Sequence, residues 1–223
     1  MNGAATSWIQ RMTQDLMYRP RAFAVDDVAA LHAVLRERVF ATFAADQDGA
    51  LRFAYAPVVV DADNGPLGAV RFHLARNNPL AELTDGATVA FSIIASDAYV
   101  SPDWYDTKGR VPTWNYIAIE GRGVVARLNG DDLRRLLIDL SAVEEAKLAP
   151  KMPWTIDKVP EEKMDALMSA IVGFSLRFEV LEGKFKLSQN VTPEDVEGVI
   201  RGMEQRGDPA SLEIAAAMRR TRT

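Results

Sequence analysis

The sequence predicts a mainly β fold with helices (α+β), in which about six antiparallel strands close into a barrel. Apolar segments of strand length, separated by short turns, dominate residues 39–128. Strands do not alternate with long helices, which disfavours a Rossmann sheet. Neither a GxGxxG nor a GxxxxGK[ST] pattern occurs, so nothing supports nucleotide binding through a glycine-rich loop. Helices are expected mainly after the strands.

The segment before the strands predicts a helix that begins at Asp26, a good N-cap residue. Apolar residues then recur at helical spacing: Val28, Leu31, Leu35 and Val39. His32 lies beside that apolar face, so we expect it to be a structural histidine.

The first strands are expected at 39–45, 51–60 and 67–74. The turn Asp46-Gln47-Asp48-Gly49 joins the first two as a hairpin. A short helix is expected over 79–83.

Two longer strands follow. Residues 88–95 are apolar at nearly every position, as in a strand buried on both faces. Residues 113–128 form a long strand with Gly121 and Gly123 as expected bulge or bend points.

The C-terminal half predicts helices and one more strand. A helix after Asp131 has an apolar stripe formed by Leu133, Leu136, Leu137, Leu140 and Val143. A helix over 161–172 is expected to bury Met164, Leu167, Met168 and Ile171. The last strand is expected at 173–181. Thr192-Pro193 and Asp208-Pro209 each offer an N-cap followed by proline and so begin two final helices.

Composition excludes several classes of site. The chain has 223 residues, no cysteine and only two histidines, so disulfides, thiolate metal sites and a cysteine nucleophile are excluded and no metal site is expected. The net charge of −5 repels a DNA backbone, so DNA contact needs a local basic patch such as Arg219, Arg220 and Arg222. The alternative is a solvated helix end. No apolar run approaches the ~18 residues of a membrane span and no secretory signal is present, so we expect a cytoplasmic protein.

The segment from Tyr99 to Tyr116 holds two of the four tryptophans and three of the five tyrosines. Polar groups that can form hydrogen bonds stand among the rings. Flat apolar rings with convergent polar groups suit a planar anionic ligand such as a flavin nucleotide. The candidate residues are Tyr99, Ser101, Lys108, Trp114, Asn115 and Tyr116. Packing of these aromatic rings in the barrel core is the alternative.

Two further segments carry candidate ligand contacts. In His73-Leu74-Ala75-Arg76-Asn77-Asn78-Pro79 a strand ends and a helix is expected to begin, which favours a bound phosphate that Arg76 can clamp. The alternative is a corner where an asparagine merely caps the helix. Lys186, Ser188 and Gln189 follow the last strand and can reach a ligand from a neighbouring subunit; the alternative is a solvated edge.

Taken together, these segments resemble the PaiB-type FMN-binding negative transcriptional regulators. The matching segments, in the family's order and spacing, are HLARNNP, AYVSPDWY followed by Lys108, VPTWNY, AIVGF and GKFKLSQN. Met17-Tyr18-Arg19-Pro20 and Phe40-Ala41-Thr42 also fit, and the resemblance covers about residues 17–205. The family is similar to the flavin split-barrel proteins, which include the pyridoxamine-phosphate oxidases and flavin reductases.

The resemblance implies a six-stranded antiparallel Greek-key split barrel of the FMN-binding type, which works as a homodimer with FMN at the subunit interface. By that similarity His73, Arg76, Asn77 and Asn78 would hold the phosphate. Trp114, Asn115 and Tyr116 would line the isoalloxazine, and Lys186, Ser188 and Gln189 would close the site. The implied domains are an extension (1–16), the FMN-binding split barrel (17–190) and a C-terminal helical segment (191–223).

The chain departs from the family pattern at Ala56 and Glu120, where the family has histidines, and at Val191, where it has arginine. These changes leave the phosphate corner intact and remove polar groups near a substrate or ligand. The resemblance implies an FMN-binding negative regulator. The alternatives are an FMN-dependent oxidoreductase or flavin reductase, and a barrel that has lost its cofactor and serves as an interaction module. No residue is assigned a catalytic role.

Overall fold

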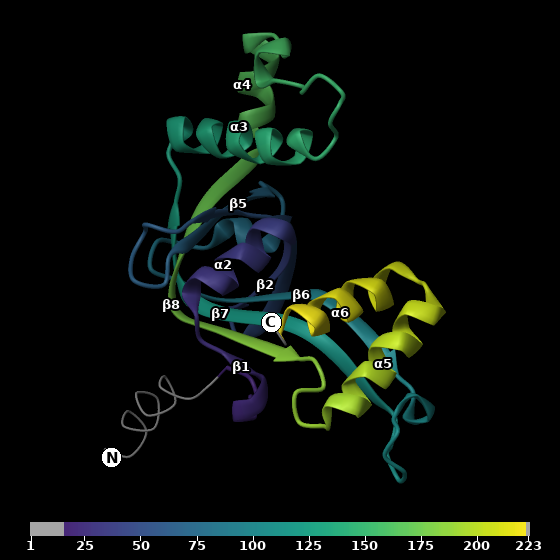
Figure 1. Ribbon diagram of the computed structural model, residues 1–223. Coiled ribbons are helices and arrows are strands. Elements are labelled where there is room, and N and C mark those ends of the chain that lie inside the picture. Colours follow the sequence, from purple (N-terminus) through teal and green to yellow (C-terminus); the bar gives the residue numbers. More distant parts are fainter. Residues whose placement is uncertain (1–15, 222–223) are drawn as a thin grey trace, which may run out of the picture. The chain divides into compact units, whose positions relative to one another are not determined.

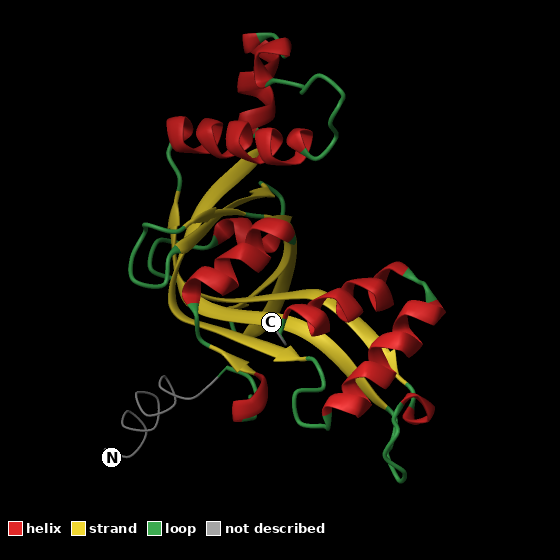
Figure 2. Cartoon of the chain, in the orientation of Figure 1, coloured by secondary structure: helices red, strands yellow, loops and turns green. Residues whose placement is uncertain are grey.

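The computed structural model describes residues 16–221 (Figures 1 and 2). Its strands are β1 (Ala24–Val25), β2 (Phe40–Gln47), β3 (Ala50–Pro57), β4 (Val59–Asp61), β5 (Ala69–Ala75), β6 (Thr88–Val100), β7 (Thr113–Arg127) and β8 (Ile171–Lys186). Its α-helices are α2 (Val28–Glu37), α3 (Gly130–Ala146), α4 (Glu161–Ser169), α5 (Pro193–Arg206) and α6 (Pro209–Arg220). The short 3₁₀ turns are η1 (Arg21–Phe23), η2 (Pro79–Glu82), η3 (Pro102–Trp104) and η4 (Ile156–Lys158). The extension predicted at 1–16 lies outside the described residues except for Leu16.

The strands form one eight-stranded sheet in the order β3-β2-β6-β7-β8-β5-β4, with β1 paired to β8. The strand pairs with a defined register are antiparallel, so the predicted α+β class is confirmed. The described strands number eight rather than the six expected. β1 has only two residues and carries little sequence signal, and the single strand predicted at 51–60 divides into β3, which pairs with β2, and β4, which pairs with β5. Their order gives an open sheet, and closure into a six-stranded Greek-key barrel stays a prediction.

The chain divides into two compact units. Unit 1 comprises Met1–Asp26, Ile94–Glu120 and Glu182–Thr223, and unit 2 comprises Asp27–Ile93 and Gly121–Leu181. The long strands β6, β7 and β8 contribute residues to both. The boundary between the units therefore falls part-way along each of these three strands.

A cluster of phenylalanine rings forms the core of unit 2. Phe43 on β2 stacks on Phe72 of β5 with ring centroids 3.9 Å apart, although β6, β7 and β8 separate these two strands in the sheet order. Phe91 meets Phe43 and Phe178 edge to face. Rings on strands that are not neighbours can stack only if the sheet curls, so the inner face of unit 2 closes around an aromatic core.

The predicted bend points on β7 are places where β8 approaches closely. A Cβ at Gly123 would lie 1.8 Å from the backbone oxygen of Arg177, and one at Gly121 would lie 2.6 Å from the Phe178 ring. A side chain at either position would force the strands apart.

The predicted helix near Asp26 is confirmed, with Asp27 rather than Asp26 as its N-cap: Asp27 Oδ1 accepts hydrogen bonds from the backbone of Ala29 and Ala30. His32 is 4% exposed, and its Nε2 lies 3.0 Å from the carbonyl oxygen of Leu67. The structural role predicted for His32 is therefore confirmed.

The hairpin of β2 and β3, the strand predicted at 67–74 and the two longer strands are confirmed. The strand predicted at 88–95 continues to Val100, and its predicted burial on both faces is wrong: buried positions alternate with exposed or half-buried ones from Thr88 to Ile94, which is 64% exposed, because only one face packs on the core.

The helix predicted over 161–172 is too long. It ends at Ser169 because β8 already begins at Ile171, where two β-branched residues favour a strand. The sequence pattern also predicts a buried Leu167, but this residue is 50% exposed. The buried residue of α4 is Met164.

The C-terminal helices of unit 1 begin as predicted. The side chains of Thr192 and Asp208 cap α5 and α6, each with proline in the first turn. Gly207 ends α5 in the left-handed conformation at φ 71° and allows the tight reversal into α6. Within residues 16–221 no helix is both long and apolar enough to cross a bilayer.

Candidate functional site

The predicted phosphate corner lies in unit 2, between the end of β5 and the single 3₁₀ turn η2. Asn78 caps this turn: its Oδ1 accepts a hydrogen bond from the Leu80 backbone at 2.9 Å. A cavity of about 390 Å³ opens beside it. The cavity is lined by Gln47, Asp48, Ala50, Arg52, Arg76, Asn77, Asn78, Pro79 and Glu82. We call it the corner cavity.

Arg76 is held firmly at the corner cavity. Its Nε donates to the carbonyl oxygen of Ser169 at 2.6 Å and its Nη2 to that of Ile171 at 3.0 Å. These carbonyls belong to the end of α4 and the start of β8. The two bonds fix the plane of the guanidinium and leave Nη1 to meet a ligand.

Arg52 on β3 is a cavity residue that the sequence does not reveal. It is exposed and forms no ion pair or hydrogen bond with any residue in the range 16–221. In the sequence, the one feature that could point to Arg52 is its position just after the Asp48-Gly49 turn. The start of β3 comes near the corner only once the sheet has folded. Asp48 and Glu82 line the same cavity and moderate its positive charge.

His73 does not line the corner cavity. It pairs with Gly173 on β8 and lies on the face of β5 opposite the core residue Phe72. Its Nδ1 is buried and has no hydrogen-bond partner among the described atoms. Burial lowers the pKa of the imidazole. The structure thus separates His73 from Arg76, Asn77 and Asn78.

The predicted ring-binding residues lie in unit 1. Trp114 is 51% exposed and Tyr116 is half-buried, whereas Asn115 between them is fully buried on the other face of β7. Tyr99 meets Trp114 edge to face at 6.0 Å. Trp114 and Tyr116 therefore share one face of β7, and Asn115 lies on the other.

Lysines lie beside these rings. Lys186 Nζ donates to Thr113 Oγ1 at 2.7 Å and to the Trp114 carbonyl at 2.5 Å. Burial, reinforced by the neighbouring Lys184, lowers the pKa of Lys186. Lys184 Nζ lies 5.3 Å from the centroid of the Tyr116 ring. Trp114 and Tyr116 thus share their face of the strand with positive charge.

Asn115 and Ser188 form a buried pair instead of an open donor set. Asn115 Nδ2 donates to Ser188 Oγ at 2.9 Å and lies 3.5 Å from Sδ of Met218 on α6. Gln189 braces the turn after β8, since its Nε2 donates to the Phe185 carbonyl and its Oε1 accepts from the Leu187 backbone. These three side chains hold the turn and α6 against the sheet, and a contact with ligand stays a prediction.

The loop of residues 101–110 is anchored to α5. Asp195 is fully buried and accepts hydrogen bonds from the Thr107 backbone at 2.9 Å and from Arg110 Nη2 at 2.6 Å. A Cβ at Gly202 would lie 2.3 Å from the Trp104 indole. Ser101 caps η3, and Lys108 is exposed without a partner in the described chain. The loop that supplies Ser101 and Lys108 is therefore rigidly seated.

An acidic pair lies further along the same strands of unit 1. Burial and the charge of Glu182 raise the pKa of Glu120, against the opposing effect of Lys184. Glu182 is 5% exposed and accepts a hydrogen bond from the Leu16 backbone at 3.0 Å. Nothing in the local sequence pattern singles out Glu182, because other charged residues stand near it on β8, such as Glu179, Lys184 and Lys186.

The predicted contacts therefore fall into two groups. Unit 2 holds His73, Arg76, Asn77 and Asn78, and unit 1 holds Tyr99, Ser101, Lys108, Trp114, Asn115, Tyr116, Lys186, Ser188 and Gln189. No group of three or more potential metal ligands occurs within the described part of the chain.

Comparison with known families decides the class of the protein. A family model described as "Putative FMN-binding domain" matches residues 17–180. The chain belongs to this FMN-binding family. The expected flavin cofactor is confirmed at the level of the family, and the match covers both the corner cavity and the aromatic strand.

Curated relatives agree with the PaiB-type resemblance. The chain is 28% identical over 206 residues to "Protease synthase and sporulation protein PAI 2" of Bacillus subtilis, covering 91% of this chain and 96% of that protein. It is 31% identical over 215 residues to an uncharacterized protein of Aspergillus fumigatus, covering 76% of this chain and 82% of the relative. The predicted membership of the PaiB-type family is confirmed.

Solved structures show the same fold at low sequence identity. The FAD and heme binding protein of Mycobacterium smegmatis matches with a TM-score of 0.53 and 18% identity, covering 80% of this chain and 79% of that one. The flavocytochrome Anf3 of Azotobacter vinelandii matches with a TM-score of 0.52 and 14% identity, covering 77% of this chain and 74% of that one.

Proposed function

We propose that this protein is an FMN-binding split-barrel protein of the PaiB type that acts as a negative transcriptional regulator. The observation that carries flavin binding is the corner cavity, where Arg52 and Arg76 face one space beside a capped turn. A phosphate monoester needs several N–H donors converging on its oxygens. Arg52, Nη1 of Arg76 and the amides of Asn77 and Asn78 supply that set. The residues present therefore fit the phosphate end of FMN.

Unit 1, taken by itself, offers a candidate surface for flat aromatic rings. Trp114 and Tyr116 offer aromatic surface, with Tyr99 supporting Trp114 from the side. A bound flavin would supply the redox chemistry, while the protein orients it and sets the local charge. Lys184 and Lys186 supply positive charge next to these rings and favour an electron-rich, reduced flavin.

A titration tests flavin binding directly. Adding the purified chain to FMN should quench the flavin fluorescence with a saturable curve, since a tryptophan or tyrosine stacked on isoalloxazine quenches its emission. Riboflavin, which lacks the phosphate, should bind at least about tenfold more weakly if the corner holds that group. Equal affinities for FMN and riboflavin would remove the corner cavity from the site.

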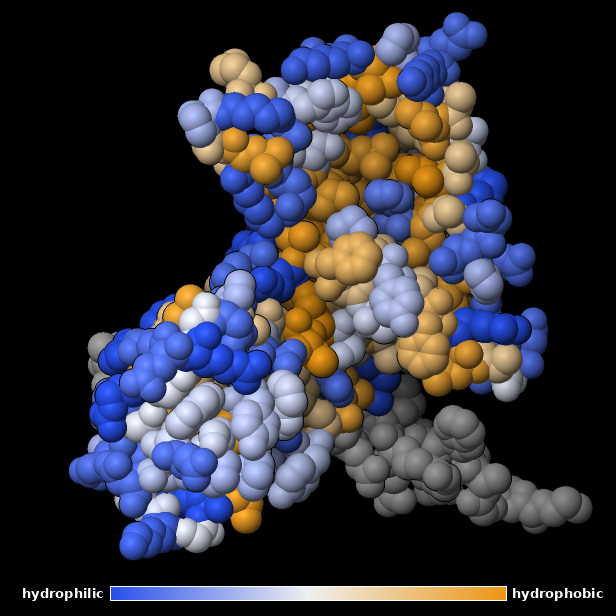
Figure 3. All heavy atoms as spheres, turned by 90° about the vertical axis from the view of Figure 1, so that its right-hand side faces the viewer, coloured by the Kyte–Doolittle hydropathy of each residue, from blue (hydrophilic) through white to orange (hydrophobic). Residues whose placement is uncertain are grey.

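We propose further that the protein is a homodimer, and unit 2 has a surface suited to this. β2 and β3 expose large apolar side chains on the outer face of the hairpin: Phe40, Leu51, Phe53 and Tyr55 are each 54–64% exposed. Figure 3 shows apolar atoms gathered on an exposed face of the molecule. Contiguous apolar patches of this kind mark interaction surfaces.

The regulatory role rests on the resemblance to PaiB-type regulators. The basic C-terminal end supports it weakly, because Arg219 is already bound to Glu204 at 2.8 Å and lies 3.8 Å from Glu197. An electrophoretic shift assay with genomic fragments tests the role. Salt-sensitive, sequence-selective shifts support it; no shift at low salt contradicts direct DNA binding.

An FMN-dependent oxidoreductase is the second candidate function. The specific observation that favours it is the positive charge of Lys184 and Lys186 beside exposed rings, which assists flavin reduction. Anaerobic addition of NADH or NADPH to the FMN-loaded protein should then bleach the flavin absorbance. Inertness to both nicotinamides counts against this candidate and leaves flavin binding untouched.

A further inference from the structure

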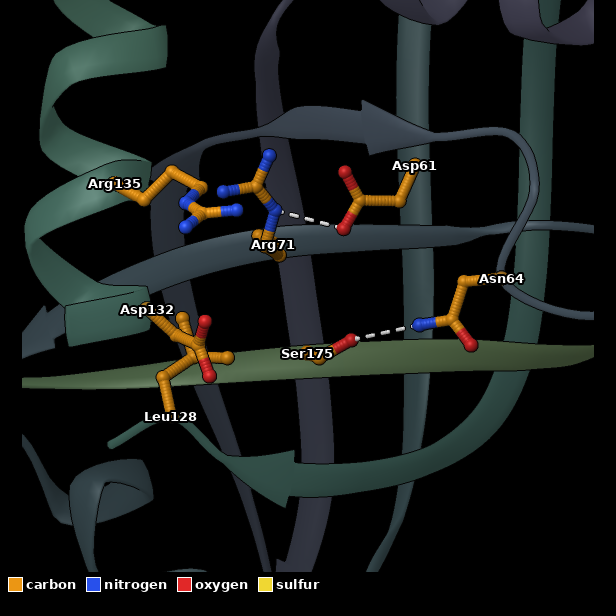
Figure 4. Close-up of a pocket in the computed structure, with 7 residues that line it drawn as sticks. All are labelled: Asp61, Asn64, Arg71, Leu128, Asp132, Arg135 and Ser175. Atoms are coloured by element: carbon orange, nitrogen blue, oxygen red, sulfur yellow. Dashed lines mark hydrogen bonds and ion pairs between the residues drawn. The ribbon is translucent and has the colours of Figure 1, made fainter. Parts of the chain in front are cut away.

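Unit 2 contains a second cavity that shares no residue with the corner cavity. Its volume is about 360 Å³, at the lower end of the range for small-molecule sites. Strands β4, β5 and β8 and the first turns of α3 contribute to it (Figure 4). The lining residues are Asp61, Asn64, Arg71, Leu128, Asp132, Arg135 and Ser175. We call it the α3 cavity.

One arginine of the α3 cavity is fixed in place. Arg71 Nε donates to Asp61 Oδ2 at 2.7 Å and Nη2 donates to Asp139 Oδ2 at 2.8 Å. The Arg71 side chain is only 13% exposed. Two charge-assisted hydrogen bonds therefore hold its guanidinium with Nη1 still available.

The other arginine lacks the partners that its helix offers. Arg135 lies three residues after Asp132 and four before Asp139, the spacing at which helical ion pairs form. It nevertheless makes no ion pair or hydrogen bond with any residue of the described chain. In Figure 4 its guanidinium points toward Arg71 and into the cavity. Arg71 is already paired with Asp61 and Asp139, so Arg135 is the guanidinium of this cavity that is left for a ligand.

Carboxylates line the same space. Asp61 has one oxygen bound to Arg71, and Asp132 has one bound to Asn129 Nδ2 at 2.8 Å, which leaves the second oxygen of each available. Ser175 Oγ and the Asn64 amide, 3.5 Å apart, add weakly engaged polar groups. The lining of the α3 cavity contains two arginines and two aspartates, so its formal charges cancel. The aspartates repel a polyanion, and the arginines repel a cation. A zwitterion carries both charges and is therefore the complementary ligand.

We propose that the α3 cavity binds a free α-amino acid. The carboxylate lies on Nη1 of Arg71 and on the fork of Arg135, and the ammonium group lies on the carboxylates of Asp61 and Asp132. The side chain of the amino acid extends along Leu128, Asn64 and Ser175. This site is separate from the flavin residues, so its occupancy does not depend on FMN.

Isothermal titration of the full chain with each proteinogenic L-amino acid tests the proposal. At least one should bind saturably. Its N-acetyl derivative, which lacks the ammonium charge, and the corresponding amine, which lacks the carboxylate, should each bind at least about tenfold more weakly. If no amino acid binds, or if the N-acetyl derivative or inorganic phosphate binds equally well, the zwitterion site is overturned.

A pair of neighbouring variants separates the site from the helix that carries it. Arg135→Gln should weaken the amino acid by about tenfold or more and leave FMN binding unchanged. Arg134→Gln is the matched control, because Arg134 pairs with Glu161 on α4, outside the cavity. The Arg134→Gln variant should bind the amino acid with unchanged affinity. Equal effects of the two variants, or none from Arg135→Gln, would overturn the assignment.

Discussion

At the scale of single residues, the two arginines of the corner cavity differ in their bonding to the rest of the protein. Arg76 is bonded to the carbonyls of Ser169 and Ile171, so it supports the fold as well as facing the cavity. Arg52 has no such bond within the described chain. Substitution of Arg52 therefore probes ligand binding alone, which makes it the sharper test.

Arg52→Ala should weaken FMN by about 10- to 100-fold, because one charge-assisted hydrogen bond to phosphate contributes roughly 1.5–3 kcal/mol. Its free energy of unfolding should stay within about 0.5 kcal/mol of the parent, as expected for an exposed side chain. Fluorescence titration and urea denaturation measure the two quantities. An unchanged FMN affinity would take Arg52 out of the phosphate site.

Arg76→Ala should lower both FMN affinity and stability. It removes a phosphate donor and also leaves the Ser169 and Ile171 carbonyls without their side-chain partner. We expect a loss of about 1–2 kcal/mol in unfolding free energy. Full stability in urea denaturation would show that the two carbonyl contacts contribute nothing measurable.

His73 should make stability depend on pH. Burial lowers its pKa in the folded protein below the ordinary value of 6.5, so the unfolded chain binds the proton more readily. The contribution of neutral His73 is present above pH 6.5 and is lost as the pH falls from 6.5 through the folded pKa. Urea denaturation across this range should show a steeper loss for the parent than for His73→Gln. Parallel pH profiles would contradict the burial of the neutral ring.

At the scale of elements, the contact between α5 and the loop 101–110 explains why the aromatic segment is ordered. Trp104 lies against two helical glycines, Gly198 and Gly202, and Asp195 of the same helix binds Thr107 and Arg110. The helix lies outside the matched region 17–180. The C-terminal segment thus helps to fix the loop that supplies Ser101 and Lys108 to the predicted ring site.

Gly202→Ala should destabilise the protein by about 1–3 kcal/mol, because the new methyl group would overlap the Trp104 indole. Gly130→Ala on α3 is the control, since a methyl group added there would meet no other atom within 4 Å. It should be neutral or stabilising. Equal unfolding free energies of the two variants in urea would contradict the packing of Trp104 on α5.

The sequence predicts the start of an element well where one local feature, such as an N-cap residue followed by proline, decides the conformation. The helix starts at Thr192-Pro193 and Asp208-Pro209 are of this kind. Local sequence signals misplace the end of α4, because residues 171 and 172 continue a helical apolar pattern while their pairing with β5 makes them strand. Arg52 and Glu182 give no local signal, because only tertiary folding brings them to the sites they occupy.

At the scale of the whole molecule, an exposed apolar hairpin face needs a covering surface. Phe53 and Tyr55 on β3 are 54% and 64% exposed, and the small residues Ala44 and Thr42 lie opposite them on β2. Such a face is costly in water. A second copy of the chain is the occupant that the family resemblance implies.

Phe53→Glu should convert the dimer to a monomer, since a charge buried without a partner at a standard interface costs several kcal/mol. Ile138→Glu, on α3 and 43% exposed, is a control at a comparable exposed apolar position and should leave the dimer intact. Light scattering after size exclusion reads the mass of each variant. A parent protein that elutes as a monomer at micromolar concentration would contradict the dimer.

The visible absorption spectrum of the purified chain, before and after addition of FMN and gel filtration, tests flavin binding most directly. We predict the visible absorption of a bound flavin at about one FMN per chain, retained through filtration and lost in a variant that combines Arg52→Ala with Arg76→Ala. A well-folded protein that stays colourless after exposure to excess FMN would contradict the account.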